Sequence, residues 1–409
     1  MVYQWLKIEI LAGGGYGRSM LKSLELENFR NYRHLKLDFE QAVGLTYLIG
    51  DNGQGKTNIL EAIYMMALTK SFRGAGEDNL IKWGEDYGRI KGSFGEDGEG
   101  DVGADVGQNT PRPADMEIFL GRPPQPKRIF KVNNVKSSSI NFIGRVKAVF
   151  FHPEDLNMLY LGPDLRRRYL DILILQESRP YFAAIRKFKR VKEQRNALLN
   201  AVREGRAEAP TMATLEVWDA QLIKEGALIW RERAETIAFI NERLADKYAE
   251  IAQEKVSLRV NYKNSLGLDF GAMSLMSNLE EVYAEELRKS KQRDLASGHT
   301  QVGPHRDDLE FILEGRPIDQ HASRGEYRTI LLALKLIEME FFSREGGRPI
   351  LLLDDVFSEL DHQRQKFLLE KVSAFQTFIT TTKDSAIINQ EKLLAGDFVE
   401  VAEGKAERV

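Results

Sequence analysis

Apolar and polar residues alternate along the segment that follows Met20. In residues 21–40, LKSLELENFRNYRHLKLDFE, apolar positions recur with a period of two, which is typical of strands with one buried face. The alternation is interrupted between Asn28 and Tyr32. We therefore expect two strands joined by a turn at this point.

A continuous apolar run and a helical pattern flank a glycine-rich segment. Residues 44–50, GLTYLIG, predict a buried strand, and residues 57–72, TNILEAIYMMALTKSF, predict a helix. Between them, Gly50–Thr57 follows the pattern G-x-x-x-x-G-K-T. Backbone N–H groups of such a loop converge on phosphate oxygens at a helix N-terminus, where the helix dipole also favours negative charge. Lys56 is expected to reach the β- and γ-phosphates, and Thr57 to bind Mg²⁺.

Two long segments with helical spacing lie in the middle of the chain. The apolar stripe of the first comprises Phe182, Ile185, Phe188, Val191, Leu198 and Val202, and that of the second comprises Leu215, Trp218, Leu222, Trp230, Ile237, Ile240, Leu244, Tyr248 and Ile251. Pro210 separates them, so we expect an αα-hairpin that forms an arm, with the stripes as its seam. Leu165–Arg206 carries twelve Lys or Arg against four acidic residues. This basic excess fits either a solvated face or a phosphate-binding face.

An apolar strand that ends in two acids follows near the C-terminus. Ile350–Leu353 predicts a buried strand, and Asp354 and Asp355 come directly after it. The first carboxylate can hold Mg²⁺ through water, and the second can orient or deprotonate an attacking water. The alternative is that both acids only end the strand and cap the next segment. Lys56 and Asp354 lie 298 positions apart, so we expect a nucleotide-binding body built from both ends of the chain.

A second candidate anion site precedes this strand. Ser323–Glu326, SRGE, opens a long apolar helix, and the Ser hydroxyl and free N–H groups at a helix N-terminus can bind an anion. The simpler alternative is an ordinary helix cap. One phosphate does not need two such loops from one subunit. If both are used, the loop of one subunit should close on the nucleotide bound by another.

Composition narrows the classes of protein that remain. A chain of 409 residues is long enough for two or more domains. The absence of cysteine excludes disulfides, zinc–thiolate sites and cysteine nucleophiles. No run of about 18 apolar residues predicts a membrane span, so we expect a cytoplasmic protein without a membrane partner.

The net charge of −3 conceals local basic regions. Residues 94–114 hold five acids between Glu96 and Asp105 and predict a flexible hairpin tip or loop insertion.

Residues 1–19 match a signal peptide poorly, because Lys7 and Glu9 break the apolar run. We interpret them as the product of a start codon placed upstream of Met20, with a genuine short extension as the alternative.

The order of these motifs along the chain resembles that of ABC-type ATPase heads, including the SMC group. More narrowly, the chain resembles the RecF family of bacterial recombination mediators from about Met20 to about residue 390. The segments that carry this likeness are LENFRNY, GDNGQGKTNILEAI, FFHPEDL, GPDLRRRYLD, GPHRDDLEF, ASRGEYRT and LLLDDVFSELD.

The resemblance implies an α/β fold, namely a P-loop ABC-type ATPase head built from both ends of the chain with an inserted helical arm. The expected parts are an N-terminal extension at 1–19, the head at 20–163 and 299–409, and the arm at 164–298. Asp354 would hold Mg²⁺ with Thr57, Asp355 would activate water, and Arg30 would contact ATP. The phosphates of the same subunit would be bound by Gly50, Asp51, Asn52, Gly53, Gln54, Gly55 and Lys56. The γ-phosphate bound by the partner would be reached by Ser323, Arg324, Gly325 and Glu326. Ser358 and Asp361 would line the dimer contact.

The resemblance also implies a function. RecF-like proteins dimerise around ATP, bind double-stranded DNA and junctions of single and double strands, and act with the mediators RecR and RecO. An ATP-dependent DNA clamp or loader of recombinational repair, with a weak ATPase as its timer, is therefore expected. The alternative is an SMC-like structural tether in which ATP only sets the oligomeric state. Candidate DNA contacts on the arm are Arg166, Arg167, Arg168, Lys187, Arg190 and Lys192.

Two features depart from the wider ABC pattern, and one expected residue cannot be placed. Thr380–Asp384 stands where transporters commonly have a histidine that senses the γ-phosphate, and the Gln that contacts Mg²⁺ is not identified. The second acid is Asp355 rather than the longer Glu, which would suit slow turnover. His152 is interpreted either as a neighbour of the site or as a packing residue of its loop.

Overall fold

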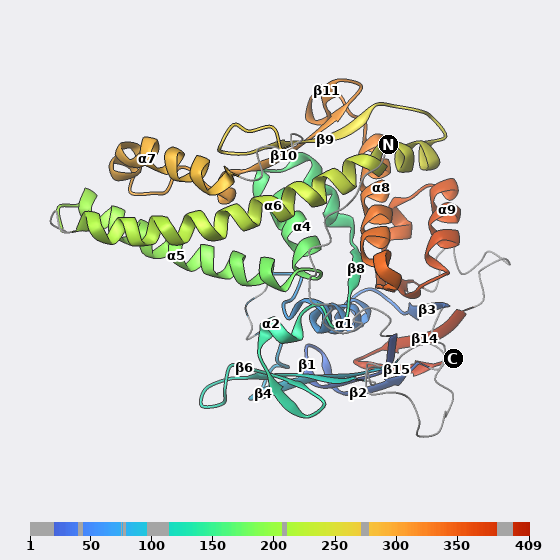
Figure 1. The fold of residues 1–409 in the computed structure, drawn as a ribbon. Coiled ribbons are helices and arrows are strands. Elements are labelled where there is room, and N and C mark those ends of the chain that lie inside the picture. The colour runs from blue at the N-terminus through green and yellow to red at the C-terminus, as the bar shows by residue number, and fades with distance from the viewer. Residues whose placement is uncertain are drawn as a thin grey trace, which may run out of the picture. The chain divides into compact units, whose positions relative to one another are not determined.

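The computed structural model describes residues 20–39, 44–74, 76, 79–95, 114–206, 211–270, 278–382 and 396–409. The chain divides into two compact units (Figure 1). Unit 1 comprises Met1–Phe151 and Phe342–Val409, and unit 2 comprises His152–Phe341. One body is therefore built from both ends of the chain, around a large insertion. The expected α/β class is confirmed, whereas the finer domain bounds stay a prediction, as do all expectations for residues 1–19, which lie outside the described residues.

A largely parallel sheet carries the predicted nucleotide motifs in unit 1. Its order is β15-β14-β3-β13-β12-β8, and only β15 runs antiparallel to its neighbour. The strands are β3 (Gly44–Ile49), β8 (Ala148–Phe151), β12 (Ile350–Asp354), β13 (Gln376–Thr381), β14 (Gly396–Ala402) and β15 (Lys405–Arg408). Thr380 of β13 is in register with Leu48 of β3 on one side and with Asp354 of β12 on the other. The carboxyl ends of the two motif strands therefore meet at one edge.

The second sheet of unit 1 is antiparallel, in the order β2-β1-β4-β5-β6-β7. It consists of β1 (Met20–Phe29), β2 (Tyr32–Asp38), β4 (Tyr87–Gly95), β5 (Ala114–Gly121), β6 (Arg128–Val132) and β7 (Val135–Ser137). The alternation in residues 21–40 thus correctly predicted two strands. β4 and β5 pair from Tyr87↔Gly121 to Phe94↔Ala114, so a hairpin flanks the predicted acidic insertion. Residues 96–113 themselves lie outside the described part of the chain.

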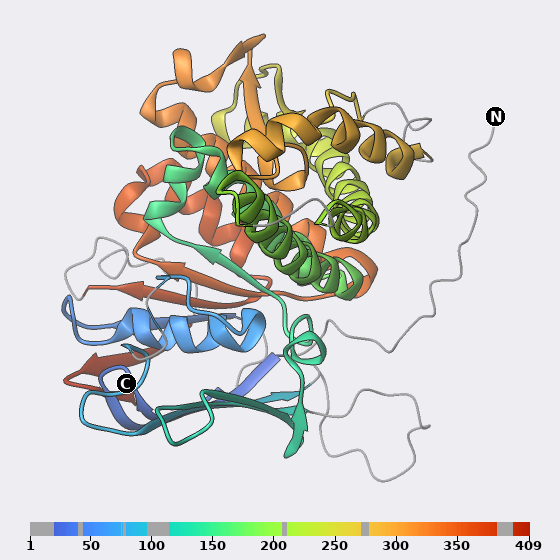
Figure 2. The ribbon, with the colours of Figure 1, turned by 90° about the vertical axis from the view of Figure 1, so that its left-hand side faces the viewer.

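Helix α1 (Lys56–Leu68) lies between these two sheets (Figure 2). Every residue from Ile59 to Leu68 is buried, as expected for a helix covered on both sides. The smaller elements of unit 1 are α2 (Ser139–Phe142), η6 (Arg344–Gly346), η7 (Val356–Glu359) and α9 (His362–Val372). The helix places its N-terminus, and hence the glycine-rich loop, next to the carboxyl end of β3.

Unit 2 is mainly helical and contains a small sheet of order β11-β10-β9. Its strands are β9 (Leu258–Lys263), β10 (Asp308–Leu313) and β11 (Arg316–Pro317). Its helices are η2 (Pro153–Leu156), α3 (Asn157–Tyr160), α4 (Pro163–Leu175), α5 (Arg179–Arg203), α6 (Thr211–Ala252), α7 (Leu279–Ser297), η4 (Pro304–Arg306), η5 (Ile318–Gln320) and α8 (Arg324–Ser343), the last of which ends in unit 1.

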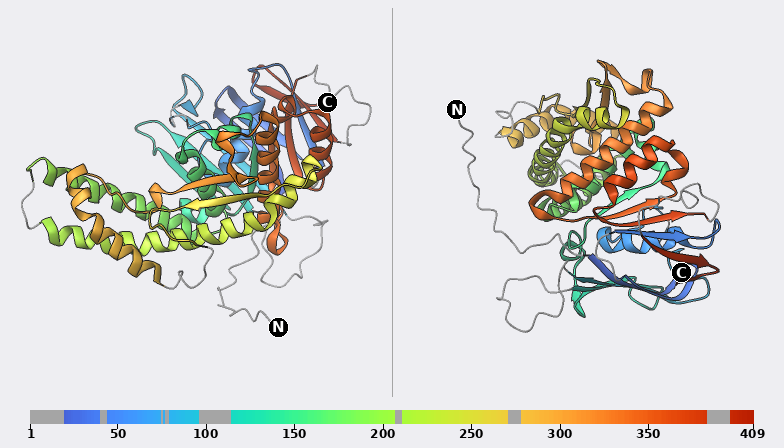
Figure 3. Two further views of the ribbon diagram at one scale, coloured as in Figure 1. Left: turned by 90° about the horizontal axis from the view of Figure 1, so that it is seen from above. Right: turned by 90° about the vertical axis from the view of Figure 1, so that its right-hand side faces the viewer.

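The predicted helical hairpin is formed by α5 and α6, which lie side by side with α7 packed against both (Figure 3). Phe188 and Val191 of α5 and Leu222 and Trp230 of α6 are buried, so these parts of the apolar stripes form the seam. The basic segment is not a single helix, because α4 ends at Leu175 and Ser178 caps α5. The turn between α5 and α6, including Pro210, falls outside the described residues.

Candidate nucleotide-binding site

The loop between β3 and α1 has a backbone shape that depends on glycine. Gly53 and Gly55 have φ angles of 83° and 117°, in the region that L side chains rarely adopt. A Cβ on Gly55 would lie 2.5–2.8 Å from side-chain atoms of Asn31 and Tyr32, and a Cβ on Gly50 would lie 2.1 Å from the carbonyl oxygen of Val401. The β1–β2 turn and strand β14 therefore pack directly against this loop.

Those neighbours also brace the loop through hydrogen bonds. Asn31 Nδ2 donates to the Gln54 carbonyl at 2.8 Å, and the Tyr32 hydroxyl donates to the Gly55 carbonyl at 3.1 Å. The Glu403 N–H donates to Gln54 Oε1 at 2.7 Å. Asn31 and Tyr32 follow Arg30 in the NFRNY segment, yet sequence reasoning assigned a role only to Arg30. Their contribution arises from tertiary contacts that no local pattern reveals.

Lys56 is buried against the loop it belongs to. Its ammonium donates to the carbonyl oxygens of Gly50 and Asp51, at 2.6 and 2.8 Å. Burial lowers its pKa, and the negative charges of Asp355, Asp354 and Asp51 oppose that shift. Phosphate oxygens are stronger acceptors for an ammonium than carbonyl oxygens, so the side chain is placed to exchange one set for the other.

The hydroxyl of Thr57 and the carboxylate of Asp354 meet at the shared sheet edge. Thr57 Oγ1 and Thr380 Oγ1 both donate to Asp354 Oδ1 at 2.9 Å, and Asp354 is buried. Among the described residues, no group of three or more His, Asp or Glu side chains could hold a metal ion. The Thr57–Asp354 pair fits Mg²⁺ nonetheless, since that ion commonly takes one or two protein oxygens and completes its shell with water and phosphate.

Asp355 lies next to this pair but reaches solvent. Its φ of 51° turns the chain sharply after β12, and its N–H donates to Thr380 Oγ1 at 2.9 Å. Loss of hydration raises its pKa, a hydrogen bond from Ser358 opposes this shift, and the charge of Asp354 reinforces it. A carboxylate with a raised pKa beside a phosphate loop is suited to accept a proton.

Ser358 and Asp361 lie in the segment that follows Asp355. Ser358 Oγ donates to the Asp355 carbonyl at 2.7 Å. Asp361 accepts from the Arg364 N–H at 3.0 Å and caps α9, and it also pairs with the Arg364 side chain. Both residues are thus held by local contacts of unit 1, and their role in a dimer stays a prediction.

Arg30 has a partner that the sequence did not predict. Its Nε and Nη2 donate to both oxygens of Glu61, at 2.8 and 2.6 Å, and Nη1 donates to the Asn79 carbonyl at 2.9 Å. Glu61 is fully buried within α1, and Arg73 lies 3.8 Å from it. The pair ties the β1–β2 turn to the helix behind the phosphate loop. A direct contact of Arg30 with ATP stays a prediction.

The SRGE segment lies in unit 2 and caps α8. The Glu326 N–H donates to Ser323 Oγ at 3.3 Å, and the Ser323 N–H donates to Glu326 Oε2 at 2.6 Å. These reciprocal bonds form a capping box and lower the pKa of Glu326. Ser323 and Arg324 are exposed, and a Cβ on Gly325 would make only an ordinary contact with Ser323 Oγ, at 3.9 Å. The capping alternative is therefore realised, and it leaves the serine at the surface.

The six candidate DNA contacts differ in their surroundings. Arg166 is bonded to both oxygens of Asp308 at 2.6 and 2.9 Å, and Lys187 pairs with Glu225 at 2.7 Å. Arg167 donates to the Asp307 carbonyl and pairs with Asp164. Lys192 is half-buried, and the other two, Arg168 and Arg190, are exposed.

His152 caps the short helix η2 within unit 2. Its Nδ1 accepts from the Glu154 N–H at 3.2 Å, and its own N–H donates to Asp155 Oδ2 at 3.2 Å. These contacts agree with a loop-packing role. Of Thr380–Asp384, only Thr380–Thr382 are described, so the missing γ-phosphate sensor is not located.

The comparisons with known proteins agree with this geometry. Residues 20–403 match the model of the RecF/RecN/SMC N terminal domain family. The DNA replication and repair protein RecF of Bacillus mycoides (strain KBAB4) is 36% identical over 386 residues, which is 94% of this chain and 97% of that protein. The chain belongs to the RecF family. It is therefore a member of a family of DNA replication and repair proteins with an ABC-type, ATP-binding head.

Solved structures show the same relationship. A structure of the recombination mediator protein RecF-ATPrS in the RecFOR pathway has a TM-score of 0.83 and 31% identity, and the match covers 97% of this chain and all of that one. The Smc head domain of Pyrococcus furiosus matches with a TM-score of 0.51 at 17% identity, which shows the shared head fold alone. Within the described ranges, no helix combines the length and apolar content that crossing a bilayer requires.

Proposed function

We propose that this RecF-family protein dimerises on ATP to bind DNA at single-strand gaps and helps partner mediators, RecR and RecO, to load a recombinase. Slow ATP hydrolysis acts as its release timer. The observation that carries the proposal is the division of nucleotide-binding groups. Lys56, Thr57 and Asp354 converge in unit 1, whereas the exposed Ser323 at the N-terminus of α8 belongs to unit 2.

The unit 1 residues form one half of the proposed ATP site. The N–H groups of Gly50–Thr57 and the Lys56 ammonium would bind the phosphates. Thr57 and Asp354 would hold Mg²⁺, which supplies charge neutralisation for phosphoryl transfer. Asp355 would orient and deprotonate the attacking water. Its side chain is one methylene shorter than that of Glu and reaches water less easily, which supports slow turnover.

The second half of the site would come from another copy of the chain. Ser323–Glu326 would reach the γ-phosphate bound by the partner, with Ser358 and Asp361 at the dimer contact. Binding ATP would then add contacts that exist only in the dimer, and hydrolysis would remove them. A ligand shifts an equilibrium toward the state that it binds more tightly. ATP contacted by both copies would therefore favour the dimer over the monomer.

Sedimentation velocity tests this proposal with the full-length chain. The protein alone should sediment as a monomer, ATP should produce dimers, and gapped duplex DNA should increase the dimer fraction. A Lys56→Met variant is the matched control and should stay monomeric in ATP. The proposal would be contradicted if wild-type protein that binds ATP remained a monomer with and without gapped DNA.

A further inference from the structure

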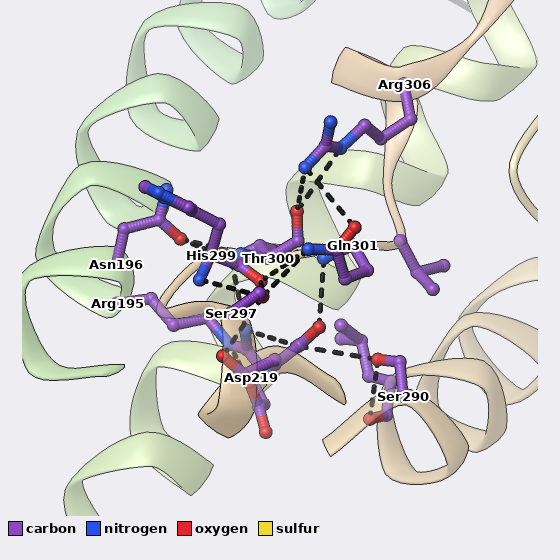
Figure 4. A network of polar contacts seen from close by, with 12 residues as sticks. Arg195, Asn196, Asp219, Ser290, Ser297, His299, Thr300, Gln301 and Arg306 are labelled. Carbon is purple, nitrogen blue, oxygen red and sulfur yellow. Dashed lines mark hydrogen bonds and ion pairs between the residues drawn. The ribbon is translucent and has the colours of Figure 1, made fainter. Parts of the chain in front are cut away.

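Cationic side chains from three elements of unit 2 converge on the segment Thr300–Asp307. Arg167 of α4 donates to the carbonyl oxygen of Asp307. Arg306 of η4 donates through Nε and Nη2 to the carbonyl oxygen of Thr300, at 3.4 and 3.2 Å (Figure 4). Lys192 of α5 completes the group, which we call the arm cluster: Arg167, Lys192 and Arg306.

The position of Lys192 follows from its helix. Phe188, four residues earlier, packs on His305 with ring centroids 5.8 Å apart. Four residues later, Asn196 Oδ1 accepts from the Thr300 N–H and hydroxyl, at 2.9 and 2.8 Å. Residues four apart share one face of a helix, so Lys192 lies on the same face of α5 as Phe188 and Asn196, the face that contacts residues 300–307.

A buried polar network holds the segment in place. Arg195 is 1% exposed, and its guanidinium pairs with Asp219 and Asp294 at 2.7 Å each. It also donates to Thr300 Oγ1 at 3.0 Å, and the Gln301 N–H donates to Asp294 Oδ1 at 3.0 Å (Figure 4). α5, α6 and α7 thus fix the backbone that Arg306 is bonded to. A cluster built on such a frame needs little rearrangement to bind a ligand.

The acids nearby are largely committed to other partners. Asp219 and Asp294 pair with Arg195, and Asp307 accepts from Trp230 Nε1 and the Tyr262 hydroxyl, each at 2.6 Å. Asp164, which pairs with Arg167, and Glu193, which is adjacent to Lys192, also lie close to the cluster, and Asp308 is bonded to Arg166. Glu193 partly offsets the charge of Lys192.

The cations also interact with one another. Burial lowers the pKa of Lys192. The negative charge of Glu193 opposes this shift, and the positive charges of Lys189, Arg306 and Arg167 reinforce it. Burial, together with the positive charges of Lys192 and Arg306, lowers the pKa of His305 to about 3, so His305 is neutral beside them. A half-buried lysine among like charges is stabilised by an arriving anion.

We propose that the arm cluster binds a phosphate of the DNA backbone, and this rests on the proposed function. The occupant is a polyanion rather than a free phosphate, because positive charge continues along the same face of α5 to the exposed Lys189, three residues before Lys192. Guanidinium and ammonium groups match phosphate oxygens and read no base edge, so the contact is independent of sequence.

A DNA titration with matched controls tests the arm cluster. Lys192→Ala and Arg306→Ala are compared with Lys224→Ala on α6 and Arg288→Ala on α7, which remove the same charges from exposed positions outside the cluster. The affinity for a labelled gapped duplex is measured with ATP over a series of salt concentrations. Each cluster variant should bind about 3- to 10-fold more weakly, with the salt slope reduced by about one, whereas both controls should match wild type.

The outcomes separate this inference from the function it rests on. Equal affinities and salt slopes for all four variants, with wild-type DNA binding intact, would overturn the arm cluster alone. Failure of the wild-type protein to bind DNA would overturn the proposed function as well. A thermal shift in inorganic phosphate that Lys192→Ala abolishes, without any loss of DNA affinity, would assign the cluster to a small anion and overturn its role on DNA.

Discussion

At the scale of single residues, two buried groups of unit 2 have pKa values shifted away from their usual ranges. Burial lowers the pKa of His305 to about 3, so it stays neutral in the folded protein. Burial, reinforced by the negative charge of Asp155, raises the pKa of Glu338 to about 7, although Lys335 lies 3.0 Å away and opposes this shift. The two groups therefore affect stability with opposite signs as the pH changes.

Each group can be isolated by one substitution. Between about pH 5 and about pH 6.5 the unfolded state binds more protons at residue 305 and fewer at residue 338 than the folded state. His305 thus makes stability rise with pH and Glu338 makes it fall, each by up to about 1.4 kcal/mol per pH unit. Relative to wild type, His305→Gln should give a more negative slope and Glu338→Gln a more positive one in urea denaturation. Parallel slopes for all three proteins would show that neither pKa is shifted.

The phosphate loop offers a second prediction at this scale. A methyl group at residue 50 would lie 2.1 Å from the Val401 carbonyl oxygen, so Gly50→Ala must displace either the loop or the β14–β15 hairpin. We expect ATP affinity to fall at least about 10-fold, since phosphate binding depends on the placement of N–H groups. Gly162→Ala is the control, because its added methyl group meets open space. Nucleotide titration by fluorescence measures both, and equal affinities would contradict the strained packing.

At the scale of elements, local patterns predicted most of the strands and helices around the nucleotide motifs. β1, β2, β3, α1 and β12 follow from period-two or helical spacing and from short apolar runs. The break between α4 and α5 was missed, although Ser178 and Pro180 are typical residues for the start of a helix. The packing of α7 on the hairpin was not predictable in the same way. It depends on contacts such as Arg195–Asp294, which join residues 99 positions apart.

That buried contact should dominate the stability of the arm. Arg195→Met would leave the carboxylate of Asp294, which is fully buried, without its charged partner. We expect the free energy of unfolding to fall by about 3–5 kcal/mol. Arg288→Met, which breaks an exposed pair with Glu285, should leave it nearly unchanged. Guanidinium denaturation compares the two, and similar losses for both would contradict the network's structural role.

At the scale of the whole molecule, sequence spacing correctly predicted that both ends of the chain build one body. The Thr57–Asp354 contact joins residues 297 positions apart. It brings together the glycine-rich loop and the acidic strand end, as their sequence motifs predicted. The residues that surround the site were harder to predict from the sequence. Arg30 is tied to Glu61 and the loop is braced by Asn31 and Tyr32, because separate turns fold onto it. Sequence motifs thus indicated the candidate ligand-binding groups but not the residues that hold these groups in place.

The role of hydrolysis is also a property of the whole molecule. Asp355→Asn removes the proposed base but keeps the side chain's size, so ATP should still bind and dimers should persist. If hydrolysis is the release timer, the variant should remain dimeric on DNA and fail in repair. The control is Asp397→Asn, a carboxylate of β14 that pairs with Arg408. Intact repair by a hydrolysis-deficient Asp355→Asn protein would instead favour the structural tether.

In the proposed function, each ATP site is shared between two copies of the chain. Mixing two inactive variants, Lys56→Met and Ser323→Arg, tests it directly, because a hybrid dimer retains one site with both residues intact. An equal mixture should recover part of the wild-type ATPase rate, whereas each variant alone stays inactive, because only the hybrid dimer has one working site among its two symmetry-related sites. No recovery, with hybrid dimers shown to form, would contradict a shared site.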